Sequence, residues 1–401
     1  MRWKALAVSA VTAFAAPAAM AQISDGVIKI GVMNDQSGLY ADLSGQGSVW
    51  AARKAVEDYC KTAKCEKIEI VFADHQNKPD VGSTTVRQWF DVDKVDAVVD
   101  VPTSSVALAV HNITKEKNKV MLNSGAASSD LTGKACSPNT VHWTYDTWAL
   151  ANGTGNAIVK TGGDSWFFLT ADYAFGHALE RDTAAVVEKS GGKVVGRVRH
   201  PFPGQDFSSF LLQAQQSKAK IIGLANAGGD TTNSIKQAAE FGITQGGQKL
   251  AALLFTLADV HGLGAEAAQG LNLTESFYWK RDAQSEEFGR RFMERTGSMP
   301  NMIHAGTYST VMSYLKAIEA AGTDETEAVA AKLHELPVND VFAQDGKVGA
   351  NGRLIKDVYL MEVKAPADIT EEWDYYNVLA TIPGDEAYLD PAESGCPLVT
   401  Q

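Results

Sequence analysis

The sequence predicts an α/β protein with two doubly wound lobes. Short apolar segments alternate with segments of helical periodicity in two successive runs along the chain. Strands that alternate with single helices form parallel sheets with right-handed crossovers, so each run predicts one lobe. The length supports the same conclusion, because 401 residues exceed what one hydrophobic core usually sustains.

The chain begins with a segment typical of exported proteins. Arg2 and Lys4 precede an apolar stretch at residues 5–19, which is short for a membrane span. The stretch ends in Ala19-Met20-Ala21, the small-x-small pattern that signal peptidases cleave. We therefore expect residues 1–21 to be a signal peptide and the mature chain to lie in the periplasm. The alternative, an uncleaved membrane anchor, is disfavoured by the short run and the cleavage pattern.

The charge of the chain excludes some classes of partner. The 36 Lys and Arg residues against 48 Asp and Glu residues give a net charge of −12, and loss of Arg2 and Lys4 with the signal peptide makes it about −14. Such a surface repels nucleic acids and anionic membranes. We therefore expect no nucleic-acid partner.

The first run of elements follows the signal peptide. The apolar segment at residues 27–33 ends in a polar turn, as a buried strand would. Val49, Ala52 and Val56 recur every three or four residues, which places them on one helical face. Asp80 is positioned to cap the next helix. The predicted strands are residues 27–33, 68–73, 97–101 and 119–122, and the helices between them extend to residues 59, 90 and 117.

The second run begins after residue 165. Its predicted strands are residues 166–169, 193–198, 221–225, 251–255 and a segment within 271–279. Helices are predicted from the loop at 172–176 to residue 190, at 207–217 and at 234–241. From Ser285 the pattern is helical at 285–296, 304–321 and 325–334, before a late strand at 357–363 and a tail without a strong period after Trp373.

These late elements predict how the two lobes are connected. The helices after Ser285 have no strand partners nearby, so the simplest packing returns them to the first lobe. The late strand and the tail then belong to the second lobe. The first lobe comprises residues 22–144 and 281–346, and the second comprises 145–280 and 347–401. The chain crosses three times, through a hinge near 144–147, Lys280 and 346–352.

Four cysteines, Cys60, Cys65, Cys136 and Cys396, favour disulfides. Their spacing does not provide the close pairs of a zinc site, and we expect no metal site. An even number of cysteines in an exported chain is typical of disulfide bonding, with three connectivities possible. We favour Cys60–Cys65, which joins a helix end to the next strand, and Cys136–Cys396, which ties the tail to the body.

The candidate ligand site lies at the carboxyl ends of the predicted strands, where open parallel sheets bind ligands. The loops there are rich in Ser, Thr, Asn, Gly and aromatic residues, and none is rich in Lys or Arg. Amides and hydroxyls at helix N-termini hold a carboxylate, and aromatic rings cover an apolar body. The loops are 37–40, 102–105, 123–127, 172–176, 226–230, 256–259 and 277–279. The candidate ligand residues are Tyr40, Thr103, Ser104, Ser105, Asn123, Ser124, Gly125, Ala126, Ala127, Tyr173, Phe175, Asn226, Ala227, Gly228, Asp230, Thr256, Asp259 and Tyr278.

These residues also have alternative structural interpretations. Each loop taken singly is also compatible with ordinary turn and cap residues. The aromatic residues Trp143, Tyr145 and Phe175 suit either a ligand cover or packing in the core or hinge.

The order of these segments resembles a known family. The stretches IKIGVMNDQSGLYADLSGQG, ADHQNKPD, VPTSSVA, LNSGAASSDLT, TADYAFG and ESFYW are similar to the type I periplasmic binding proteins of ABC transporters, in the branch of the leucine/isoleucine/valine-binding protein. The resemblance covers the mature chain. It implies two Rossmann-like lobes joined by a three-crossover hinge, one small-molecule ligand in the cleft, and delivery to an inner-membrane ABC permease with a separate ATPase. It implies a monomer without a cofactor.

The resemblance also assigns roles to residues. The hydroxyls of Ser104 and Ser105 match the position that binds a ligand carboxylate, and Gly125 and Ala127 match positions that add backbone groups. Tyr173 matches an aromatic cover from the second lobe. In amino-acid binders an acidic residue pairs with the ligand ammonium, and the candidates are Asp259 and Asp230. This chain has glycine and alanine where those binders have a small residue and threonine, which removes a side-chain contact there.

An enzymatic function has little support in the sequence motifs. The nearest match to a dinucleotide fingerprint is Gly45-Gln46-Gly47, with bulky Trp50 in place of the third glycine. No nucleophile elbow, P-loop or HExxH motif occurs in the sequence, and His75 is expected to be a surface residue that closes a turn. We expect a binding protein for a small carboxylate with an apolar or aromatic body, and a hydrophobic amino acid is the leading case. The alternative is a ligand-sensing receptor subunit that binds an amide or urea-like solute.

Overall fold

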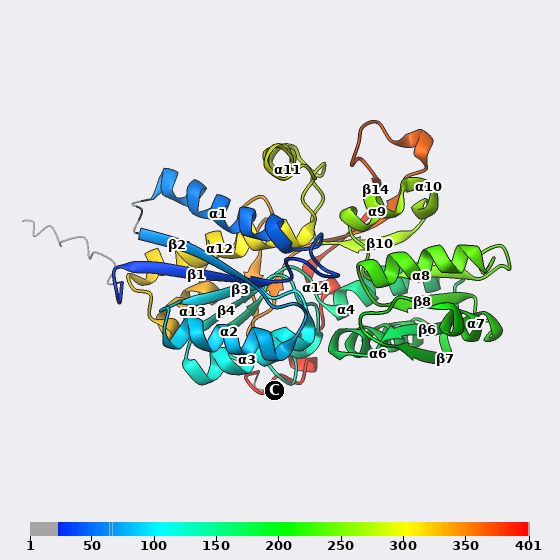
Figure 1. The fold of residues 1–401 in the computed structure, drawn as a ribbon, viewed down its shortest axis with the longest axis horizontal. Coiled ribbons are helices and arrows are strands. Elements are labelled where there is room, and N and C mark those ends of the chain that lie inside the picture. Colours follow the sequence, from blue (N-terminus) through cyan, green and yellow to red (C-terminus); the bar gives the residue numbers. More distant parts are fainter. Residues whose placement is uncertain (1–22, 64, 66, 400–401) are drawn as a thin grey trace, which may run out of the picture.

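The structure is a computed structural model that describes residues 23–63, 65 and 67–399, so the predicted signal peptide lies outside the described residues. Two α/β lobes lie side by side along the long axis of the molecule (Figure 1). In the described part of the chain, no helix is both long enough and apolar enough to span a bilayer.

The first lobe contains a five-stranded parallel sheet of order β2-β1-β3-β4-β5. Helices α1 and α12 cover one face, and α2 and α3 cover the other (Figure 1). The strands are β1 (Val27–Asn34), β2 (Lys67–Asp74), β3 (Ala97–Asp100), β4 (Val120–Asn123) and β5 (Thr140–His142). The helices are α1 (Gly45–Thr62), α2 (Pro79–Asp91), α3 (Ser104–Lys117), α11 (Ala283–Thr296), α12 (Met302–Ala321) and α13 (Thr326–Glu335).

The second lobe repeats this arrangement in a four-stranded parallel sheet of order β7-β6-β8-β9. Its strands are β6 (Ser165–Ala171), β7 (Lys193–His200), β8 (Ile221–Ala225) and β9 (Lys249–Ala252). Its main helices are α6 (Ala174–Lys189), α7 (Ser208–Gln216), α8 (Gly229–Glu240), α9 (Leu257–Leu263) and α10 (Ala265–Ala268). An antiparallel sheet of β10 (Asn272–Glu275), β13 (Val358–Val363) and β14 (Tyr376–Ile382) adjoins it. The predicted class of two doubly wound lobes is confirmed.

Three segments carry the chain between the lobes. The first follows β5, and the second leads from β10 to α11. The third leads from β12 (Leu354–Ile355) to β13, because the hairpin of β11 (Lys347–Val348) and β12 stays beside the first lobe. Backbone bridges pair Val338 with Gly346 and His142 with Arg353. Residues 347–355 therefore lie against the first lobe rather than the second, and the third crossing follows them.

Both predicted disulfides are present. Cys60–Cys65 joins the end of α1 to the start of β2. Cys136–Cys396 links a loop of the first lobe to the end of the C-terminal tail. The tail leaves β14 in the second lobe and returns to the first, so this disulfide is a further covalent connection between the lobes.

Several elements differ from the sequence prediction. A continuous helical segment, α4 (Thr147–Leu150), η2 (Ala151–Gly155) and α5 (Asn156–Lys160), was not predicted because glycine and asparagine lower helix propensity. Gly153 is needed there, since a Cβ would collide with the side chain of Thr274 on β10. The predictions also omitted β5, which has three residues, and β14, an edge strand that is exposed on both faces for most of its length.

Three local predictions need correction. Strand β9 ends at Ala252, and the buried run at 253–255 continues beyond the ladder toward α9. The N-cap of α2 is Lys78, so Asp80 lies in the first turn and does not cap the helix. His75 is buried instead of lying on the surface, and its Nδ1 accepts the Asn77 amide at 3.0 Å.

Candidate functional site

The two lobes meet through a pair of tyrosines. The hydroxyls of Tyr40, from the loop after β1, and Tyr173, from the loop after β6, lie 2.5 Å apart. Because the two loops belong to different lobes, this hydrogen bond spans the cleft and the structure is in a closed form.

Local contacts hold both tyrosines in place. The buried carboxylate of Asp35 accepts the amides of Gly38 and Tyr40 at 2.7 and 2.8 Å, which folds the loop after β1. Tyr173 is the N-cap of α6, and its ring stacks on Phe202 with ring centroids 4.0 Å apart. Phe202 also stacks on Tyr40 at 5.8 Å. The three rings form an aromatic cover over the cleft.

A small cavity that is partly open to solvent lies against this cover, and its volume of about 10 Å³ is about what one water molecule needs. Both lobes contribute to its wall, which is aromatic and aliphatic. The lining residues are Tyr40, Leu43, Pro102, Gly125, Ala127, Tyr145, Tyr173, Phe175, Ala227, Leu254 and Ile303. No charged side chain is among these lining residues, all of which belong to the described part of the chain. The character of the wall suits a small ligand with an apolar body, and such a ligand needs the lobes to lie further apart than they do here.

The polar groups at the wall come mainly from the backbone. Within the described residues, the amide of Ala127 has no hydrogen-bond acceptor. The amide of Gly125 donates to Asp100 O at 3.0 Å, and the carbonyl of Gly125 accepts the Tyr145 hydroxyl at 2.9 Å. Gly125 was expected to offer a backbone donor to a carboxylate, but its amide is already engaged in this closed form.

Helix N-termini add a favourable field for a negative group. Helices α3, α6 and α8 begin at the carboxyl ends of β3, β6 and β8, and all three ends face the cleft. Each of these helices has at least 12 residues. The cleft therefore combines an uncharged wall with partial positive charge from both lobes.

Of the predicted ligand residues, six line the cavity: Tyr40, Gly125, Ala127, Tyr173, Phe175 and Ala227. Gly228 lies next to them with φ of +57°, and a Cβ there would approach the Leu39 carbonyl to 2.9 Å. Glycine therefore allows the two lobes to come together closely at this point.

The other predicted residues of the first lobe lie behind the wall and hold its loops. The Ser104 hydroxyl accepts the amide of Ser128 at 3.3 Å, and Thr103 donates to Asn77. The Asn123 side chain bonds to both the amide and the carbonyl of Ala126, at 3.1 and 2.9 Å. The Ser124 and Thr307 hydroxyls lie 2.8 Å apart. Ser105 is in the first turn of α3 and does not line the cavity.

In the second lobe, Asp230 and Asp259 differ in their surroundings. The Asp230 Oδ1 accepts the Gly204 amide at 3.0 Å, whereas its buried Oδ2 has no hydrogen-bond partner among the described residues and lies 3.9 Å from His200 Nδ1. Burial raises the pKa of Asp230 to about 7. The Asp259 Oδ2 accepts both the amide and the hydroxyl of Thr256, which forms the capping box of α9. Burial raises the pKa of Asp259 to about 6, although these bonds oppose the shift.

Two further predicted residues do not reach the cavity. Asn226 is buried beneath the wall, where its amide nitrogen lies 3.1 Å from His200 Nε2 and its oxygen accepts the Thr231 hydroxyl at 2.7 Å. Tyr278 donates to Asp374 Oδ1 at 2.9 Å, so it packs the junction with the C-terminal tail instead of covering a ligand.

The structure adds residues that the sequence did not single out for the site. Leu43, Leu254 and Ile303 are apolar residues of the wall, and Phe202 completes the cover. Tyr145 lines the cavity and also belongs to the first crossing between the lobes. Phe202 follows the carboxyl end of β7, and this position is the signal that points to it.

Comparisons with known proteins agree with this architecture. Residues 27–368 match the model of a family described as periplasmic binding protein. The chain is 25% identical over 393 residues to "Leu/Ile/Val-binding protein homolog 6" of Brucella melitensis. The match covers 94% of this chain and 96% of that protein.

Two solved structures are similar over nearly the whole chain. A periplasmic binding protein from Burkholderia mallei has a TM-score of 0.92 and 50% identity, over 94% of this chain and 100% of that one. A branched chain amino acid ABC transporter periplasmic ligand-binding protein from Burkholderia xenovorans has a TM-score of 0.82 and 37% identity, over 92% of this chain and 99% of that one.

Proposed function

The chain belongs to the periplasmic binding proteins of ABC transporters, in the branch similar to the Leu/Ile/Val-binding protein, and from this premise we propose that it captures a small carboxylate with an apolar or aromatic body. Members of this family bind small molecules and work with ABC permeases; they are not enzymes. The observation that carries the proposal is the cavity between the lobes, whose lining residues are uncharged and include the hydrogen-bonded pair Tyr40 and Tyr173.

The ligand's carboxylate meets the positive ends of α3, α6 and α8 and the amide of Ala127, which has no acceptor among the described residues. Its body lies against Tyr145, Phe175 and the aliphatic wall. The open form binds the ligand first on the loops of the first lobe, and Tyr173 then closes over it. A ligand that contacts both lobes only in the closed form shifts the population toward that form.

A hydrophobic amino acid is the leading ligand. Its ammonium needs a negative partner, and Asp230 suits this role better than Asp259. The buried Asp230 Oδ2 makes no hydrogen bond among the described residues and lies 3.9 Å from His200 Nδ1, whereas the Asp259 carboxylate caps α9. The name of the relative from Burkholderia xenovorans, which refers to branched chain amino acids, supports the same choice. We further propose that the protein acts as a monomer and delivers its ligand to a permease driven by a separate ATPase.

The test is a binding screen on protein that has been unfolded and refolded to release any bound solute. The compounds are L-leucine, L-phenylalanine, benzoate, acetamide and urea, and the readouts are thermal shift and calorimetry. We expect a raised Tm with the first three and none with acetamide or urea. Binding of acetamide or urea without any carboxylate would overturn the proposed ligand class.

Variants then locate the site. Tyr173→Ala removes one half of the bridge and a ring of the cover, so we expect at least about tenfold weaker binding. Tyr278→Phe is the matched control, because Tyr278 lies away from the cavity, and its affinity stays unchanged. Asp230→Asn weakens binding of L-leucine but not of benzoate. Equal affinities in Tyr173→Ala and the unmodified protein remove Tyr173 from the site.

A further inference from the structure

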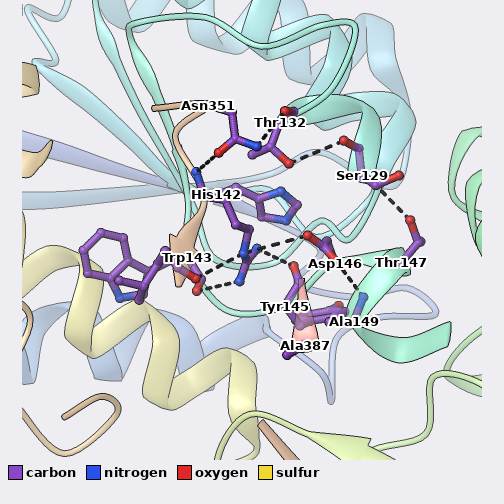
Figure 2. A network of polar contacts seen from close by, with 12 residues as sticks. Ser129, Thr132, His142, Trp143, Tyr145, Asp146, Thr147, Ala149, Asn351 and Ala387 are labelled. Carbon is purple, nitrogen blue, oxygen red and sulfur yellow. Dashed lines mark hydrogen bonds and ion pairs between the residues drawn. The ribbon is translucent and has the colours of Figure 1, made fainter. Parts of the chain in front are cut away.

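A buried arginine lies at the centre of the hinge. Arg353 is 1% exposed and lies just before β12, at the start of the third crossing. Its Nη1 donates to the carbonyl of Tyr145 and its Nη2 to the carbonyl of Trp143, both at 2.9 Å. Figure 2 shows these carbonyls and Asp146 converging on one guanidinium. The third crossing is thus joined to the first by hydrogen bonds.

The surroundings of Arg353 offset the cost of burying its charge. The Asp146 Oδ2 lies 3.8 Å from Nε, and Nε donates to the Leu354 carbonyl at 3.3 Å. The ring of Tyr388, from the C-terminal tail, covers the guanidinium at 4.3 Å. A buried charge with this many partners is stable only while the partners stay in place, so the network resists displacement of the first crossing.

The first crossing also forms part of the ligand cavity. Tyr145 lines the cavity wall, and its hydroxyl donates to the carbonyl of Gly125, another wall residue, at 2.9 Å. Arg353 therefore holds the carbonyl of Tyr145, and Gly125 holds its hydroxyl. The position of the ring therefore depends on a residue 208 positions later in the chain.

We propose that Arg353 is a positioning residue for ligand binding, which holds the carbonyls of Trp143 and Tyr145 and thereby fixes the Tyr145 ring in the cavity wall. The inference rests on the proposed function, because it assigns a task to the wall of that ligand site. Lysine does not replace arginine here, since one ammonium lacks the planar fork that reaches two carbonyls at once.

A matched control lies three residues further along. Lys356 is also a buried cation of the third crossing, but its Nζ donates to the carbonyls of Ser276 and Asp357, at 2.5 and 2.8 Å. It therefore holds the second crossing and does not contact Tyr145. Lys356→Met perturbs the hinge to a similar degree without releasing the first crossing.

The first measurement needs no ligand. The protein is labelled with 3-fluorotyrosine, and Tyr145→Phe identifies the fluorine resonance of Tyr145. We expect Arg353→Lys and Arg353→Met to move this resonance toward the position of exposed tyrosines, and Lys356→Met to leave it unchanged. Circular dichroism melting shows which variants are folded, and Arg353→Lys is the conservative one. An unmoved Tyr145 resonance in a folded Arg353→Lys protein would falsify the proposal.

The second measurement links the position of Tyr145 to binding. With L-leucine and benzoate as probes, Arg353→Lys weakens binding about tenfold, and the same change in a Tyr145→Ala background weakens it less than threefold. Such non-additivity indicates that Arg353 acts through Tyr145. Additive effects contradict the proposal. If neither probe binds any variant, the proposed function fails, and the fluorine resonance still decides the role of Arg353.

Discussion

At the scale of single residues, Asp100 shows how the cavity wall is shaped. Asp100 and Val101 have φ of +80° and +55°, a region that favours glycine and is rare for a β-branched residue such as valine. The bend turns the Asp100 carbonyl toward the amide of Gly125, 3.0 Å away. The Asp100 carboxyl is buried, and its Oδ2 accepts the Asn34 side chain at 3.0 Å. Local strain and a buried acid thus support a loop that lines the site.

Asp100 makes the stability of the protein depend on pH. Burial raises the pKa of its carboxyl to about 7 from an ordinary value of 3.8. Between these values the folded protein retains a proton that the unfolded chain has released, so stability falls as the pH rises from about 4 to about 7. In Asp100→Asn this loss disappears. We expect its Tm to exceed that of the unmodified protein by about 1 °C at pH 8, which corresponds to about 1 kcal/mol for a chain of this length, and by less at pH 4.5.

Calorimetry at both pH values tests this prediction. Asparagine tolerates positive φ, so the substitution keeps the backbone bend. A Tm difference that is the same at pH 4.5 and pH 8 would show that the Asp100 carboxyl does not titrate in this range.

At the scale of elements, helix α6 connects the lobes at two places. Its N-cap, Tyr173, contributes to the cavity, and two turns later Arg181 and Asp182 contact η1 (Ser129–Leu131) of the first lobe. Arg181 donates to Ser129 Oγ at 2.7 Å and to Asp130 Oδ1 at 3.0 Å. The Ser129 hydroxyl in turn donates to Asp182 Oδ2 at 2.7 Å. These contacts join the lobes at a distance from the ligand and stabilise the closed form.

The contact between α6 and η1 predicts an effect on ligand release. Arg181→Ala removes two hydrogen bonds between the lobes, so the closed form loses about 1 kcal/mol and binding weakens about fivefold, mainly through faster dissociation. Stopped-flow kinetics measures both rates. Arg197→Ala is the matched control, since Arg197 pairs with Glu180 of the same helix at 2.8 Å but within the second lobe. The two arginines are similarly exposed, at 48% and 55%. Equal dissociation rates in both variants argue against this contact.

At the scale of the whole molecule, the C-terminal tail adds a covalent connection to the three crossings. After β14 the tail passes the helical segment at residues 147–160, where Asn152 donates to the Ala387 carbonyl at 3.5 Å. It then covers Arg353 with Tyr388 and ends at the Cys136–Cys396 disulfide on the first lobe. The tail therefore joins both lobes and the hinge.

The two disulfides are expected to differ in their effect on stability. The cysteines of Cys136–Cys396 are 260 residues apart in sequence, and those of Cys60–Cys65 are five apart. A longer loop restricts the unfolded chain more strongly, so replacing Cys136 and Cys396 by serine costs about 3–5 kcal/mol of unfolding free energy, and the same change at Cys60 and Cys65 costs less. Urea denaturation of both double variants measures these losses. A larger loss from the Cys60 and Cys65 variant would contradict this expectation.

The sequence alone determined most of the elements, because their signals are local. The spacing of Val49, Ala52 and Val56 predicts α1, and the buried apolar runs predict the central strands. Alternation of strands and helices then predicts two parallel sheets. Elements that depend on distant neighbours were missed. Strand β14 pairs with the distant strand β13, and Gly153 suits its helix because Thr274 lies against it.

For the site, the sequence determined the edge of each sheet where the loops meet, and only the tertiary structure decided which side chains face the cavity. Ser104, Asn123 and Asp259 are polar residues of the predicted loops, yet they hydrogen-bond to Ser128, Ala126 and Thr256 instead of lining the cavity. The wall forms when two lobes, distant in sequence, close together and bury apolar residues such as Leu43 and Leu254. Arg353 meets its partners across 208 and 210 residues, a contact without any local signal in the sequence. Local periodicity specifies secondary structure, whereas the closing of the lobes specifies the site.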